Sequence, residues 1–127
     1  MPAGQRIEML VADRRGLRDL RAAVRGLATS AHVAADDLVL AASEIVTNAL
    51  LYVDGPCVLR GWLVGKVVRI EVSDCGALHL PSVASAMPTA DGGHGLSIVD
   101  RVVSRWDVQI HDGVGKTVWF EVDATSD

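Results

Sequence analysis

Residues 40–50 read Leu-Ala-Ala-Ser-Glu-Ile-Val-Thr-Asn-Ala-Leu, a mostly apolar stretch in which Glu44 and Asn48 stand four residues apart. Apolar residues at this spacing predict a helix that faces a core. Residues at positions i and i+4 lie on the same side of a helix, so a carboxylate and a carboxamide project side by side. Burying an unpaired amide costs about 2–7 kcal/mol, and burying an unpaired charge costs more. The pair therefore indicates either the wet edge of a helix or a ligand site, and a metal ion carrying a phosphate fits the second.

Length and composition limit the class of protein. With 127 residues, half of them hydrophobic, the chain is expected to form a single domain over residues 1–127 with a proper core. It has no apolar run near the ~18–20 residues that span a bilayer, and its first residues lack a signal-peptide pattern. We therefore expect a soluble, cytoplasmic protein without membrane contact. A net charge of −4 and the absence of a basic stripe argue against direct binding to nucleic acid.

Periodicity and turn signals place the expected elements along the chain. They predict a strand at residues 6–12, helices at 15–28 and 34–52, a hairpin of strands 57–64 and 67–74, a helix at 96–103, and strands at 106–111 and 116–122. This order predicts an α+β fold. We expect a two-layer α/β sandwich with a mixed, antiparallel-rich sheet and helices on one face.

The hairpin register follows from its two-residue turn, Gly65-Lys66. It pairs Leu59 with Val72, Gly61 with Ile70, Leu63 with Val68 and, on the other face, Arg60 with Glu71. Agreement of apolar and charged pairs supports the register. It places Asp74 on the apolar side, opposite Cys57, and points Cys75 the other way, so both cysteines are expected to be structural thiols and not a disulfide.

Two further segments are compatible with ligand binding. Asp74-Cys-Gly76 ends a strand with a carboxylate, which can accept a hydrogen bond from an amino group of a base, and a glycine, which admits a flat ring. Gly92-Gly-His-Gly95 opens a helix after a long loop, where free backbone N–H groups favour an anion. Each segment alone is also an ordinary turn. Gly113-Val-Gly-Lys-Thr117 resembles the end of a P-loop, but Ile110 replaces its leading glycine and a strand follows it.

Together, in this order, the segments resemble the Bergerat ATP-binding fold of the gyrase, histidine-kinase and MutL superfamily. Within it, the closest likeness is to the small anti-sigma-factor serine/threonine kinases that are common in actinobacteria. The likeness rests on Ala42-Ser-Glu-Ile-Val-Thr-Asn-Ala49, Val72-Ser-Asp74, Gly93-His-Gly-Leu-Ser-Ile-Val-Asp100 and Gly115-Lys-Thr-Val-Trp-Phe120. It covers nearly the whole chain.

The resemblance implies a role for each residue of the helical pair. Glu44 matches the catalytic carboxylate that polarises the attacking hydroxyl or water, and Asn48 matches the Mg²⁺ ligand that bridges the phosphates of ATP. This chemistry is coherent, because phosphoryl transfer depends on alignment and charge neutralisation, and Mg²⁺ keeps several waters beside a single protein oxygen.

The resemblance also implies the residues that bind the nucleotide. Asp74 matches the residue that accepts a hydrogen bond from the adenine amino group, and Gly76 matches the glycine beside the ring. Thr117 matches the threonine that supports this aspartate, directly or through water. The phosphate-facing segment consists of Gly93, His94, Gly95 and Leu96.

The implied function is that of an ATP- and Mg²⁺-dependent protein serine/threonine kinase. It would bind a sigma factor and phosphorylate a STAS-type anti-sigma-factor antagonist, and the resemblance also implies dimerisation. Leu51 and Tyr52 stand where the family usually has a basic residue and a histidine, and Leu78 replaces a further glycine. The alternative is thus a nucleotide-binding partner-switch protein without phosphotransfer. The catalytic part of a sensor histidine kinase fits poorly, because we expect no phosphoacceptor-histidine helix before the domain.

Overall fold

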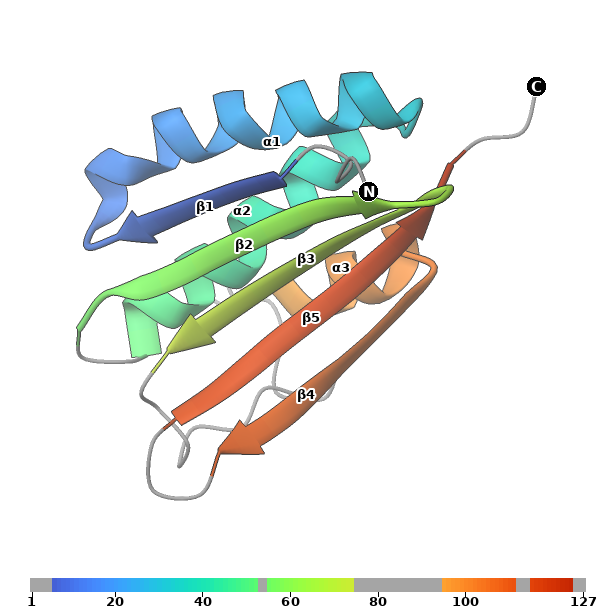
Figure 1. The fold of residues 1–127 in the computed structure, drawn as a ribbon. Coiled ribbons are helices and arrows are strands. Elements are labelled where there is room, and N and C mark those ends of the chain that lie inside the picture. Colours follow the sequence, from blue (N-terminus) through green and yellow to red (C-terminus); the bar gives the residue numbers. More distant parts are fainter. Residues whose placement is uncertain (1–5, 53–54, 75–94, 112–114, 125–127) are drawn as a thin grey trace.

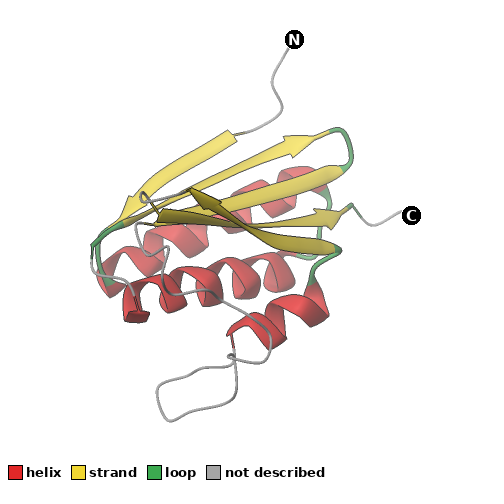
Figure 2. Cartoon of the chain, turned by 90° about the horizontal axis from the view of Figure 1, so that it is seen from below, coloured by secondary structure: helices red, strands yellow, loops and turns green. Residues whose placement is uncertain are grey.

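Helices cover one face of a five-stranded antiparallel sheet in this computed structural model, which describes residues 6–52, 55–74, 95–111 and 115–124 (Figures 1 and 2). Its elements are β1 (Arg6–Val11), the 3-10 helix η1 (Arg14–Gly16), α1 (Leu17–Ala31), α2 (Ala35–Tyr52), β2 (Cys57–Val64), β3 (Val67–Asp74), α3 (Gly95–Val102), β4 (Arg105–His111) and β5 (Gly115–Asp123). The expected α+β sandwich is confirmed. Its sheet was expected to be mixed and antiparallel-rich, and the described pairings are all antiparallel.

The strands lie in the order β1-β2-β3-β5-β4, so the last strand of the chain is inside the sheet. Every described pairing is antiparallel. The predicted hairpin register is confirmed, since Leu59 pairs with Val72 and Arg60 with Glu71. The sheet therefore has two distinct faces, and each residue's face follows from its position along its strand.

The core lies between the sheet and the helices. Alternate residues of β2 and β3 are buried, because one face of each strand meets α1 and α2 while the other does not. The largest fully buried side chains include Phe120, Leu20, Leu27, Leu38, Leu59 and Ile70. These residues come from α1, α2, β2, β3 and β5, so a single core joins both layers.

The first helix begins later and ends later than its sequence pattern predicts. Asp13 accepts a hydrogen bond from the backbone N–H of Arg15 at 2.9 Å, as expected of a cap, but residues 14–16 form the 3-10 turn η1 before α1 begins. The helix continues to Ala31 and ends at His32, whose φ of 56° is left-handed. A residue in this conformation stops the helical hydrogen-bond pattern.

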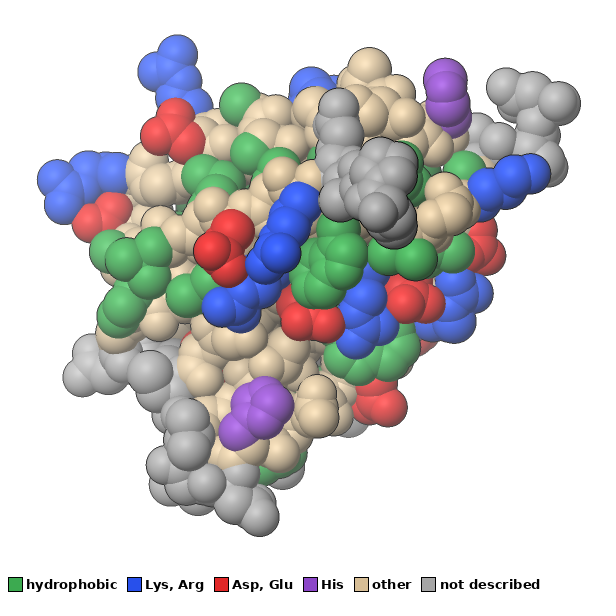
Figure 3. Space-filling model, viewed as in Figure 1, with side chains coloured by type: hydrophobic (Ala, Val, Ile, Leu, Met, Phe, Trp, Pro, Cys, Tyr) green, Lys and Arg blue, Asp and Glu red, His purple; other side chains and the backbone are tan. Residues whose placement is uncertain are grey.

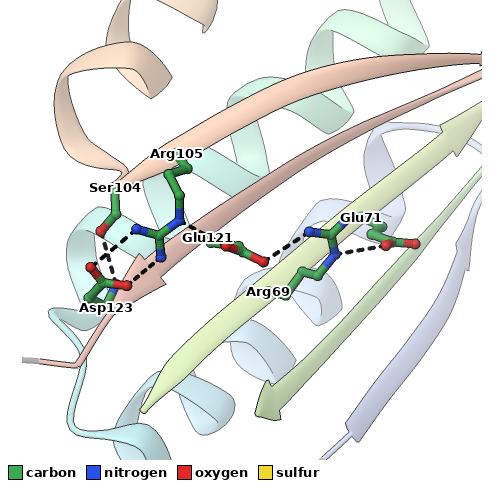
Figure 4. Close-up of polar contacts among 6 residues, drawn as sticks. All are labelled: Arg69, Glu71, Ser104, Arg105, Glu121 and Asp123. Carbon is green, nitrogen blue, oxygen red and sulfur yellow. Dashed lines mark hydrogen bonds and ion pairs between the residues drawn. The ribbon is translucent and has the colours of Figure 1, made fainter. Parts of the chain in front are cut away.

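The open face of the sheet carries acidic and basic side chains beside one another (Figure 3). Arg69 of β3 and Arg105 of β4 both bind Glu121 of β5, each at 2.9 Å (Figure 4). Arg69 also stacks on Trp119, with 4.2 Å from its guanidinium carbon to the ring centroid. This network links three neighbouring strands on the side that none of the described helices covers. Among the described helices, none is long and apolar enough to cross a bilayer.

Candidate functional site

Glu44 and Asn48 lie on one uninterrupted helix. Because α2 runs from Ala35 to Tyr52 without a break, the two side chains lie one turn apart on the same side. The neighbouring core stripe is buried and consists of Leu38, Ala41, Ala42, Ile45, Val46 and Ala49. Glu44 and Asn48 are partly buried beside it. The helix is therefore fixed by its apolar stripe and presents a carboxylate and a carboxamide at the border of the core.

The central position of α2 brings this pair near the end of β3. The helix packs between α1 and α3 and also against β2 and β3. Figure 1 shows α2 running behind the sheet and ending toward the same end of the molecule as β3. Asp74 is the last residue of β3, and its place in the alternation puts it on the helix-facing side with Val68, Ile70 and Val72.

Asp74 is paired with a lysine that the sequence reasoning missed. The Nζ atom of Lys116 lies 3.0 Å from Oδ1 and 3.0 Å from Oδ2 of Asp74. The exposed fraction of the side chain is 2% for Asp74 and 5% for Lys116. Asp74 is opposite Lys116 in the register of β3 and β5, so the two side chains share a face. The sequence feature that could have revealed this lysine is the two-residue alternation of β5. In it, Lys116 shares a face with the buried Val118, Phe120 and Val122.

Thr117 is expected to support Asp74 directly or through water, and its described side-chain contacts are with two other residues. Its Oγ1 atom lies 2.9 Å from Ser73 Oγ and 2.9 Å from His111 Nε2. Thr117 is opposite Ser73 in the register, and successive residues of a strand face opposite sides of the sheet. Thr117 and Asp74 therefore belong to different faces, and Lys116 is the residue of β5 with a described contact to the Asp74 carboxylate. The role of Thr117 stays a prediction.

Cys57 lies beside this ion pair and is a free, buried thiol, as expected. Burial raises the pKa of the Cys57 thiol to about 11, and the negative charge of Asp74 contributes in the same direction. A thiol in such surroundings is protonated near neutral pH and chemically unreactive. Cys57 is thus part of the wall around Asp74, and Cys75 lies outside the described residues.

The glycine-rich segment is described only at its end. Gly95 begins α3 and Leu96 follows in its first turn, where backbone N–H groups are not yet used by the helix. Gly76, Gly93 and His94 lie outside the described residues, as does Leu78. Their predicted roles at the nucleotide stay predictions.

The donor set fits a magnesium–phosphate ligand better than a protein-only metal cage. In the part of the chain that the structure describes, no group of three or more His, Cys, Asp or Glu side chains is placed to hold a metal ion. Mg²⁺ takes oxygen ligands and keeps several waters, so one carboxamide oxygen and phosphate oxygens suffice. The oxygen of Asn48, at the edge of the core on α2, is a suitable donor of this kind.

Comparisons with known proteins identify the family of the chain and a solved structure of similar fold. The family model of the histidine kinase-like ATPase domain matches residues 8–122. A crystal structure of the RsbU and RsbW domains of a Mycobacterium tuberculosis protein is similar in fold, with a TM-score of 0.70 and 21% sequence identity. The match covers 97% of this chain but only 33% of that one. A search of curated proteins finds no match. With its fold, its polar pair on α2 and a family match over residues 8–122, the chain belongs to the histidine kinase-like ATPase domain family.

Proposed function

We propose that residues 1–127 form one ATP- and Mg²⁺-binding domain that acts as an anti-sigma-factor serine/threonine kinase. The observation that carries this proposal is the placement of Glu44 and Asn48 on the central helix, which packs against the strand that ends in Asp74. A base-binding carboxylate and a phosphate-binding pair are needed at the two ends of one nucleotide. Asp74 and the Glu44–Asn48 pair both lie on the helix-facing side of the sheet.

Asn48, Glu44 and Asp74 would each have a separate role in phosphoryl transfer. The carboxamide oxygen of Asn48 would hold Mg²⁺, which neutralises phosphate charge when bound. The carboxylate of Glu44, one helical turn earlier, would accept a hydrogen bond from the attacking serine hydroxyl and orient it. Asp74 would accept a hydrogen bond from the amino group of the base. The protein thereby contributes alignment and charge compensation, which are the main requirements of this reaction.

The partners in this proposal come from the sequence resemblance. They are a sigma factor, which the protein would bind, and a STAS-type antagonist, which it would phosphorylate on serine; both place it in the cytoplasm. The likeness to a protein with an RsbW domain supports the proposal only through the shared fold. Nucleotide state would bias which partner is held, because binding sites that share one conformational equilibrium are coupled.

Asn48→Ala tests the nucleotide part of the proposal. We expect this variant to fold and to lose Mg-ATP binding, because the ligand between the helix and the phosphates is gone. Isothermal titration calorimetry with ATP, with and without Mg²⁺, measures the effect. Asp37→Asn, a change in the exposed first turn of the same helix, is the control and should bind like the wild type. Unchanged affinity in Asn48→Ala would contradict the assigned role.

Glu44→Gln tests the catalytic part. We expect Mg-ATP affinity close to that of the wild type and phosphate transfer slower by about 10²–10⁴-fold, the usual effect of losing a positioned base. Transfer of labelled phosphate from ATP to a purified STAS-domain protein provides the measurement, with Asp37→Asn again as the carboxylate-to-amide control. Transfer at the wild-type rate would remove Glu44 from the mechanism.

A second candidate function is nucleotide-dependent partner switching without phosphate transfer. The observation that favours it is Leu51, a partly buried apolar residue at the place where the resembled kinases usually have a basic one. The same transfer assay separates the two functions. Wild-type protein that binds Mg-ATP and the STAS-domain protein but transfers no phosphate would establish the second candidate.

A further inference from the structure

The ion pair between Asp74 and Lys116 joins the ends of two neighbouring strands inside the molecule. The ammonium nitrogen of Lys116 is equally close to both carboxylate oxygens, at 3.0 Å from each. A cation that contacts both oxygens fixes the direction in which the carboxyl group points, and with it the position of the group. The orientation of the Asp74 carboxylate is therefore set by a residue of β5.

The surroundings of this pair are nearly free of solvent. The exposed fraction of the side chain is 2% for Asp74 and 5% for Lys116. The pKa of the neighbouring Cys57 thiol is raised mainly by burial and further by the charge of Asp74. Replacing a buried ion pair by apolar residues is often neutral or stabilising, so stability alone is a weak reason for keeping one. A carboxylate held in one orientation at a candidate base-binding position offers a more direct reason.

We propose that Lys116 is a positioning residue for base recognition, which holds the Asp74 carboxylate in the orientation that accepts a hydrogen bond from the exocyclic amino group of adenine. This inference rests on the proposed nucleotide binding at Asp74. It assigns to Lys116, and not to Thr117, the support of the base-binding carboxylate. Lys116 acts through Asp74, and its effect should be specific to the amino group that Asp74 recognises.

The experiment compares two nucleotides that differ only in this amino group. ATP and purine riboside 5′-triphosphate, which lacks the 6-amino group, are titrated in the presence of Mg²⁺ into wild type, Lys116→Met and the control Lys66→Met. Methionine keeps the length of the lysine side chain without its charge. Lys66 is exposed in the β2–β3 turn. The readout is the ratio of the two affinities in each protein.

The proposal expects wild type and Lys66→Met to prefer ATP. Lys116→Met should lose ATP affinity on the order of tenfold, the effect of one charge-assisted hydrogen bond, while its affinity for the analogue changes by less than about twofold. Equal losses for both nucleotides would mean a merely structural role for Lys116 and would overturn the proposal, as would an unchanged preference for ATP.

A second variant covers a failure of Lys116→Met to fold. Lys116→Arg keeps the counter-charge but moves it to a longer, planar group, so the carboxylate is held in a different orientation. We expect its ratio of ATP to analogue affinity to change at least about threefold, and a ratio equal to that of the wild type would overturn the proposal. A wild-type protein that binds neither nucleotide would instead refute the proposed function, and the inference with it.

Discussion

One residue step along β5 separates Lys116, which binds Asp74, from Thr117, which binds Ser73 and His111. Lys116 and Thr117 are both buried and both hydrogen-bonded, but to partners on opposite faces of the sheet. The sequence resemblance selected Thr117 by its position in a motif. The two-residue repeat of a strand selects Lys116, because only every second residue shares a face with Asp74.

Gly61 shows how tightly a single position is packed. A Cβ atom added there would lie 2.6 Å from Ile70 Cδ1 and 3.1 Å from both Ile7 Cγ1 and Leu27 Cδ2. We expect Gly61→Ala to lower the free energy of unfolding by about 1–3 kcal/mol, the usual effect of overpacking. Urea denaturation of wild type and variant provides the measurement.

Gly26 on α1 is the matched control for this change. A Cβ atom there meets nothing within 4 Å. Alanine is favoured over glycine inside a helix by roughly 0.5–1 kcal/mol, so Gly26→Ala should be more stable than the wild type. If Gly61→Ala also proved neutral or stabilising, the close packing between sheet and α1 at this point would be refuted.

The three strands β3, β5 and β4 are connected on their open face by Glu121. Its hydrogen bond with Arg105, and then that with Arg69, lowers the pKa of the Glu121 carboxyl from its ordinary 4.5. A carboxyl whose pKa is lower in the folded than in the unfolded protein stabilises the fold above its unfolded pKa. This contribution is lost as the pH falls through the lower, folded pKa.

The free energy of unfolding should therefore depend measurably on pH through Glu121. We expect the free energy of unfolding of the wild type to fall as the pH drops below about 4.5. Glu121→Gln should show a smaller decrease over the same pH range, because glutamine does not titrate. Urea denaturation at a series of pH values between neutral and acid measures both slopes. Equal slopes in the two proteins would show that Glu121 is not a source of this dependence.

The sequence predicted the strands and their local register better than the limits of the first helix. The hairpin register could be predicted because apolar and charged pairs had to agree across a two-residue turn, as Leu59 with Val72 and Arg60 with Glu71 do. The start of α1 could not be predicted, because Asp13 caps a 3-10 turn as readily as an α-helix. The end of α1 depends on the left-handed backbone of His32, a conformation that few non-glycine residues adopt.

For the molecule as a whole, the class and layers of the fold followed from the order of its elements, while the order of strands did not. Nothing local in β5 shows that it lies between β3 and β4. The Asp74–Lys116 pair depends on this placement, because it joins residues that are far apart in the sequence. The closeness of Glu44 and Asn48 on α2 was therefore predictable from helical spacing, whereas the contact of Asp74 with Lys116 was not.

The interior position of β5 also has a consequence for the order in which the protein can be assembled during synthesis. In the described sheet, β4 has β5 as its sole neighbour, so it has no strand to pair with until residues 115–123 have left the ribosome. The same late strand supplies Lys116 to Asp74. A nascent chain can thus form the hairpin and its helices early, but the Asp74 carboxylate is joined by Lys116 only when β5 has been inserted.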